Sequence, residues 1–112
     1  MSNVYDEAHK LARAIKDSEE YKNYIQKREV VYSDKRNKEM VEDFRNKVLK
    51  VQMEQLSGKE IEKDEIEKLN RLEEVLMLNP KISDYFAAEL RFSQMVRDIN
   101  NIIGEAIDIK ED

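Results

Sequence analysis

Apolar residues recur at helical spacing along almost the whole chain, and their longest run begins at Pro80. Asn79 suits the N-cap of a helix, and Pro80 suits its first position, where a missing N–H is no loss. The run holds Tyr85, Phe92, Ile99 and Ala106 at one heptad position, Ala88, Met95, Ile102 and Ile109 three residues further on, and Ile82, Val96 and Ile103 beside them. This pattern predicts one long helix from Pro80 to Ile109 with a coiled-coil-like seam.

Shorter amphipathic segments precede this helix, and each follows a signal that starts helices. The signals are Asn3 with Asp6, Ser18 with Glu19 and Glu20, Ser33-Asp34, and Asp64 with Glu67. Gly58 is placed as a left-handed residue that ends a helix. With two glycines and one proline in 112 residues, little of the chain can be turn. We predict an all-α fold of four to five helices, a helical bundle with a long C-terminal helix, in a single domain over residues 1–112.

The length of the C-terminal helix predicts self-association. About 28 residues of α-helix span roughly 42 Å, whereas a compact chain of this size has a diameter of about 34 Å. An apolar seam that extends past its own domain needs cover, and a second copy of the chain can supply it, as a homodimer or a higher homo-oligomer. The residues predicted to mediate self-association are Phe92, Met95, Val96, Ile99, Ile102 and Ile103.

Two charged residues interrupt apolar stripes. Glu89 takes the position that isoleucine or valine holds in the neighbouring heptads, and Arg28 lies within a tyrosine-rich stripe. Each can lie at the edge of its stripe and extend to water. Alternatively, Glu89 forms a buried ion pair with Arg28 or Arg45 that fixes the helix register.

The chain carries five tyrosines, and three of them fall in one helical segment. Tyr21 fits the role of a core residue. Tyr24 and Tyr32 are candidates for an aromatic surface on which a partner protein docks.

Composition argues against several classes of function. The 25 acidic and 20 basic residues are well mixed and leave a net charge of -5, so direct binding to nucleic acid is disfavoured. The chain has no cysteine, and His9 is its single histidine. We therefore expect no catalytic group, no cofactor, no metal site and no small-molecule substrate. No apolar run is long enough to span a membrane, and no signal sequence is recognisable, so we expect a cytoplasmic protein.

Short motifs, taken in order along the chain, resemble the bacterial YlbF/YmcA (Com_YlbF) family and, within it, the YheA-like branch. The matching motifs are Val4-Tyr5-Asp6, Ser18-Glu19-Glu20-Tyr21, Asp43-Phe44-Arg45, Gln52 and Gln55 before Gly58-Lys59-Glu60-Ile61, Asn79-Pro80, Ala88-Glu89, Ser93-Gln94 and Asp98-Ile99-Asn100-Asn101-Ile102-Ile103. They run from end to end of the chain. Their order and spacing carry the resemblance, because each motif alone is little more than a helix signal.

The resemblance implies an all-helical cytoplasmic protein of Gram-positive bacteria that has no known enzymatic activity and acts through protein partners. Family members are linked to competence, sporulation and biofilm formation, and to accessory roles for ribonuclease Y. Some relatives hold an iron-sulfur cluster with cysteines, which this chain lacks. We expect a non-enzymatic interaction module with an unidentified protein partner. The alternative is a regulatory protein that binds RNA directly, whose affinity would fall steeply with salt.

Overall fold

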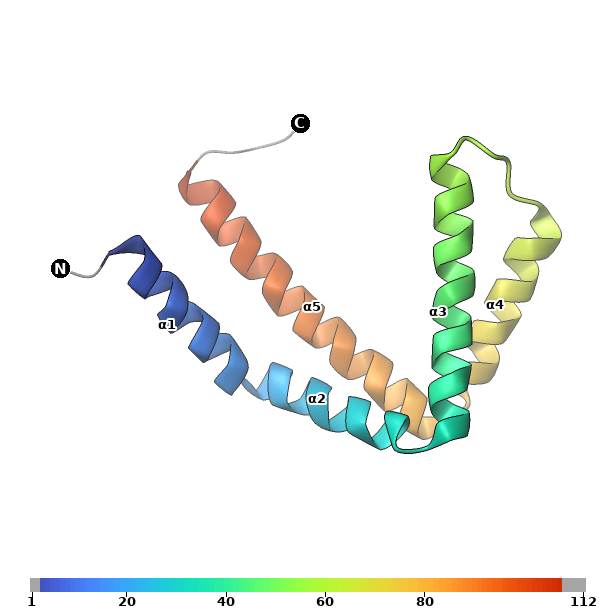
Figure 1. Cartoon of the computed structure of the whole chain (residues 1–112), viewed down its shortest axis with the longest axis horizontal. Coiled ribbons are helices and arrows are strands. Elements are labelled where there is room, and N and C mark those ends of the chain that lie inside the picture. The colour runs from blue at the N-terminus through green and yellow to red at the C-terminus, as the bar shows by residue number, and fades with distance from the viewer. Residues whose placement is uncertain (1–2, 108–112) are drawn as a thin grey trace. The chain divides into compact units, whose positions relative to one another are not determined.

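The computed structural model describes residues 3–107 and places 92 of these 105 residues in five α-helices (Figure 1). The helices are α1 (Val4–Asp17), α2 (Glu19–Tyr32), α3 (Lys35–Leu56), α4 (Lys63–Met77) and α5 (Pro80–Ala106). No strand occurs within residues 3–107. The predicted all-α class and the long C-terminal helix are therefore confirmed. Ile109, which the sequence pattern assigned to that helix, lies outside the described residues.

At most of the predicted helix starts, the expected side chain accepts an N-cap hydrogen bond. The Asn3 side chain accepts a hydrogen bond from the Asp6 N–H at 2.8 Å, and the Ser18 hydroxyl accepts one from the Tyr21 N–H at 3.1 Å. Asp34 accepts from the backbone of two residues at the start of α3. Because each cap satisfies N–H groups that have no partner within the helix, the breaks between helices follow from local sequence.

The start of α4 differs from the prediction. Its N-cap is Glu62, which makes no side-chain cap hydrogen bond, and Asp64 lies in the first helical turn. An acidic residue in the first turn is favoured by the partial positive charge of the helix N-terminus without capping it. At the other end of the preceding loop, Gly58 has a φ of 82°, the left-handed conformation expected where α3 ends.

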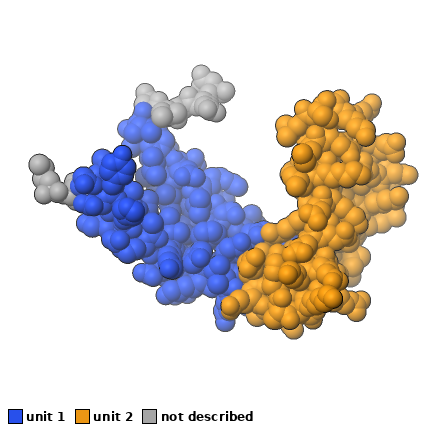
Figure 2. Space-filling view, viewed as in Figure 1, with its two compact units in different colours: residues 1–27, 86–112 blue, residues 28–85 orange. Residues whose placement is uncertain are grey.

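The chain divides into two compact units (Figure 2), here called unit 1 (residues 1–27 and 86–112) and unit 2 (residues 28–85). In unit 2, α3 and α4 pack side by side as an antiparallel pair (Figure 1). The buried apolar residues of unit 2 are Val31, Val41, Val51, Leu76, Ile82 and Tyr85. The prediction that residues 1–112 form a single domain stays a prediction.

One polar residue is buried with the apolar core of unit 2. Asn37, in the first turn of α3, is 7% exposed. Its side-chain oxygen accepts a 2.9 Å hydrogen bond from the Asn79 amide, which lies 42 residues further on. The Asn79 oxygen in turn accepts hydrogen bonds from Lys81 N–H and Ile82 N–H at the start of α5. The same amide therefore caps α5 and ties its start to α3.

Unit 1 has much less buried surface than unit 2. Among its described residues only Ala88 is fully buried. Tyr21 and Tyr24 of α2 pack on Phe92 of α5, with ring centroids 5.4 and 5.3 Å apart. The helices of unit 1 thus have apolar faces but little internal core of their own, and burial is the main source of helix stability in proteins.

Candidate interaction surfaces

The predicted self-association seam lies on one side of α5, and its exposure increases toward the C-terminal end. Phe92 is half-buried beneath the tyrosine rings of α2, and Met95, Val96 and Ile99 are also half-buried. Ile102 is 67% exposed and Ile103 is 47% exposed. We use the term α5 seam for these six residues together: Phe92, Met95, Val96, Ile99, Ile102 and Ile103. Its C-terminal part is therefore largely exposed apolar surface.

The two tyrosines proposed for partner docking both make intramolecular ring contacts. The Tyr24 ring stacks on Phe92 with an interplanar angle of 9°. The Tyr32 ring meets Tyr85 edge-on at 6.1 Å, and the Arg28 guanidinium lies 4.3 Å from the Tyr32 ring centroid. Both tyrosines are half-buried, so only part of each ring is available to a partner, and their role in docking stays a prediction.

The residues of the candidate ion pair have different surroundings. Glu89 is half-buried on α5. Arg28 is exposed and stacks on Tyr32, and Arg45 is half-buried with its guanidinium 5.4 Å from the Tyr85 ring centroid. Cation–π contacts of this kind stabilise each arginine beside its tyrosine ring. Glu89 belongs to unit 1 and both arginines to unit 2, so a buried pair stays a prediction.

Stability measurements on Glu89→Ala, Arg28→Ala, Arg45→Ala and the two double variants decide between the interpretations. If Glu89 is paired and buried, removing one partner is expected to cost about 3–5 kcal/mol, while replacing both by apolar residues is close to neutral. If Glu89 lies at the edge of the stripe, Glu89→Ala is expected to change the free energy of unfolding by less than about 0.5 kcal/mol. Small effects that add strictly in the doubles would contradict the buried pair.

The N-terminal helix leaves its apolar face open. The face predicted from the spacing consists of Val4, Ala8, Leu11, Ala12 and Ile15. Of these only Ile15 is half-buried, and Val4 is 82% exposed. The sequence predicted this amphipathic helix correctly, but amphipathicity does not reveal whether the apolar face is covered within the chain or by another molecule.

A second open stripe lies on α3 and was not singled out from the sequence. Leu49, Met53 and Leu56 follow one another at helical spacing, and all three are exposed, Leu56 to 87%. They share one side of the helix because residues separated by three or four positions are neighbours on a helix surface. The spacing of these residues in the sequence could have predicted this surface. We call Leu49, Met53 and Leu56 the α3 stripe.

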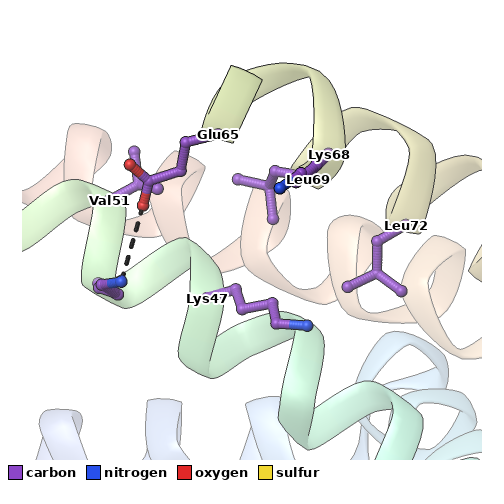
Figure 3. Close-up of a pocket in the computed structure, with 7 residues that line it drawn as sticks. Lys47, Val51, Glu65, Lys68, Leu69 and Leu72 are labelled. Carbon is purple, nitrogen blue, oxygen red and sulfur yellow. Dashed lines mark ion pairs between the residues drawn. The ribbon is translucent and has the colours of Figure 1, made fainter. Parts of the chain in front are cut away.

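A pocket of about 300 Å³ lies between α3 and α4 in unit 2 (Figure 3). Its apolar lining comes from Val51, Leu69 and Leu72, and lysines and Glu65 surround it. The Lys50 ammonium lies 4.0 Å from the Glu65 carboxylate across the two helices. The charges around the pocket are thus partly paired with one another, and their arrangement does not select a ligand.

Metal-binding and membrane-spanning features are absent from the part of the chain that the structure describes. No three or more histidine, cysteine, aspartate or glutamate side chains among residues 3–107 gather where they could hold a metal ion. None of the five helices is long and apolar enough to cross a membrane.

Comparison with known proteins places the chain in a family. Residues 4–108 match the family model described as "Control of competence regulator ComK, YlbF/YmcA". The chain belongs to the YlbF/YmcA family. Relatives of this YlbF/YmcA protein are named UPF0342 proteins. One from Caldicellulosiruptor saccharolyticus is 37% identical over 112 residues, which are the whole of this chain and 93% of the relative. Another from Symbiobacterium thermophilum is 41% identical over 106 residues, 95% of each chain.

Two solved structures share the fold of this YlbF/YmcA protein. The "Protein of Unknown Function (DUF964) from Bacillus stearothermophilus" has a TM-score of 0.86 at 24% identity and covers 94% of this chain and 92% of its own. The structure of "yheA from Bacillus subtilis" has a TM-score of 0.69 at 27% identity and covers 96% of this chain and 97% of its own. The resemblance to the YlbF/YmcA family and its YheA-like branch, based on short motifs, is thus confirmed.

Proposed function

We propose that this protein is a non-enzymatic, cytoplasmic helical module that self-associates through the α5 seam and serves a regulatory or accessory role by binding another protein. The supporting observation is the C-terminal part of the α5 seam, where Ile102 and Ile103 are exposed in a unit whose described residues bury only Ala88. Contiguous exposed apolar surface of this kind marks interaction sites in soluble proteins. The family description, which concerns control of a competence regulator, fits a role exerted through another protein.

Sedimentation equilibrium of the unmodified protein tests self-association. We expect a dimer or larger assembly at micromolar concentration, with an association constant that changes little between low and moderate salt, because apolar contact dominates the seam. A protein that stays monomeric throughout this range would contradict the proposal. A parallel mobility-shift titration with single-stranded RNA tests the alternative, since RNA binding that weakens steeply with salt would favour direct recognition of phosphates.

Affinity purification of the tagged protein from its own cells tests the binding of a second protein. We expect a partner that the unmodified protein retains and that Leu49→Glu/Met53→Glu loses, because two charges on the α3 stripe would have to be desolvated in an apolar contact. The matched control is Val75→Glu/Leu78→Glu, which adds the same number of charges at exposed apolar positions of α4 and its C-cap. Equal retention by all three proteins would exclude the α3 stripe as the contact surface.

A further inference from the structure

The apolar side of α5 is nearly symmetric about Ile99. Counting three, four and seven residues in either direction from Ile99 reaches an apolar residue each time. These residues are Phe92, Met95 and Val96 on the N-terminal side and Ile102, Ile103 and Ala106 on the C-terminal side. At about 100° per residue they fall within a stripe roughly 120° wide. Two copies of such a helix can therefore pack antiparallel, with apolar residues of one helix opposite apolar residues of the other along the whole stripe.

Two charged residues flank this stripe and have no partner within the described chain. Arg91 and Glu105 are exposed, and neither makes an ion pair or a side-chain hydrogen bond with residues 3–107. They are 14 residues apart, about four helical turns, so they lie on the same flank of α5. Asp98 lies between them on that flank and accepts a 3.0 Å hydrogen bond from Gln94. Arg91 lines a surface hollow with Glu19 and Glu20 of α2 but forms no ion pair with either carboxylate. The flank therefore carries one positive and one negative charge that can pair with another molecule.

We propose that two copies of the chain pair through α5 in an antiparallel, two-fold symmetric arrangement with Ile99 at the axis. This inference rests on the proposed function, since it specifies the geometry of the self-association. The layer of Met95 and Val96 in one chain then meets the layer of Ile102 and Ile103 in its partner. Ala106 of each chain reaches the level of the partner's Phe92, where a small residue leaves room for the rings of Tyr21 and Tyr24 packed on that phenylalanine.

The charges favour this direction over a parallel one. In the antiparallel pair, Arg91 of each chain lies within about 3 Å, measured along the helix axis, of the level of the partner's Glu105 and on the same flank. In a parallel pair, Arg91 lies level with another Arg91, and Glu105 lies about 21 Å further along the axis. Only the antiparallel arrangement brings Arg91 and Glu105 level with each other at both symmetric positions, and such complementarity determines register more than affinity.

Disulfide cross-linking of single-cysteine variants tests the geometry, because the chain has no cysteine of its own. A disulfide needs Cα atoms within about 7 Å. We expect Ile99→Cys to form a covalent dimer on mild oxidation. Ile103→Cys alone is expected not to, because its two copies would be offset by about 12 Å along the axis. Met95→Cys alone is likewise expected to stay uncross-linked, whereas a refolded mixture of Met95→Cys and Ile103→Cys is expected to cross-link.

Charge reversal supplies a second measurement that does not depend on thiols. We expect Arg91→Glu and Glu105→Arg each to weaken dimerisation about tenfold, because each change affects two symmetric pairs, and the double variant to restore it. Cross-linking of Ile103→Cys alone would overturn the antiparallel geometry in favour of a parallel one. A dimer with no cross-link at any of the three positions would place the contact on another face, and would overturn both the antiparallel geometry and the α5 seam as the surface of self-association. A monomeric unmodified protein would overturn both.

Discussion

Replacing Ile99 and Ile103 together by glutamate is expected to convert the self-associated protein into a monomer. Full burial of an isoleucine side chain contributes about 1.5–3 kcal/mol, and a symmetric dimer contains four of these side chains. Both are partly covered already in the single chain, so we expect a loss of at least about 3 kcal/mol, which raises the dissociation constant more than a hundredfold. The carboxylates add to this, because an apolar contact would have to desolvate them.

Sedimentation equilibrium at matched concentrations measures this effect. The control is Leu90→Glu combined with Asn101→Glu, which adds the same number of charges at exposed positions on roughly the opposite side of α5. We expect the control to associate like the unmodified protein. A double isoleucine variant that sediments as the unmodified protein does would exclude the α5 seam as the association surface. Circular dichroism of each variant shows whether the helices persist, and the buried residues of unit 2 lead us to expect that α3 and α4 do.

Asn37→Ala is expected to destabilise unit 2 by more than the removal of a small polar side chain would otherwise suggest. The change leaves the Asn79 amide without its 2.9 Å acceptor at a part-buried position. An unsatisfied buried donor costs about 1–3 kcal/mol, more than the net value of a typical hydrogen bond. Asn79→Ala is expected to cost at least as much, because it also removes the cap of α5, a contribution of about 1 kcal/mol.

Chemical denaturation at one protein concentration measures these free energies, since self-association makes stability depend on concentration. The double variant Asn37→Ala/Asn79→Ala completes a cycle, and we expect a coupling of about 0.5–3 kcal/mol between the two residues. Asn70→Ala serves as the control because Asn70 is exposed on α4, and its effect is expected within about 0.5 kcal/mol. Additive losses in the cycle would show that the amide pair does not couple α3 to the start of α5.

The sequence alone determined where the helices begin and end. Asn3, Ser18, Asp34 and Asn79 act as caps through atoms two or three residues away, so their effect is contained in the local sequence. The same holds for Gly58, whose left-handed φ ends α3. The one misplaced start, at Asp64, shows the limit of such signals, because an acidic residue is also favoured inside the first turn.

The tertiary structure decided which surfaces are covered. Asn37 is buried because the fold brings the first turn of α3 against Asn79, 42 residues away, and no local pattern encodes that contact. Tyr24 is stacked on Phe92 for the same reason. Conversely, α1 and the end of α5 have apolar faces as regular as those of core helices and yet remain open. Helical periodicity specifies that a face is apolar, whereas its burial depends on non-local packing, which only the folded chain or its assembly supplies.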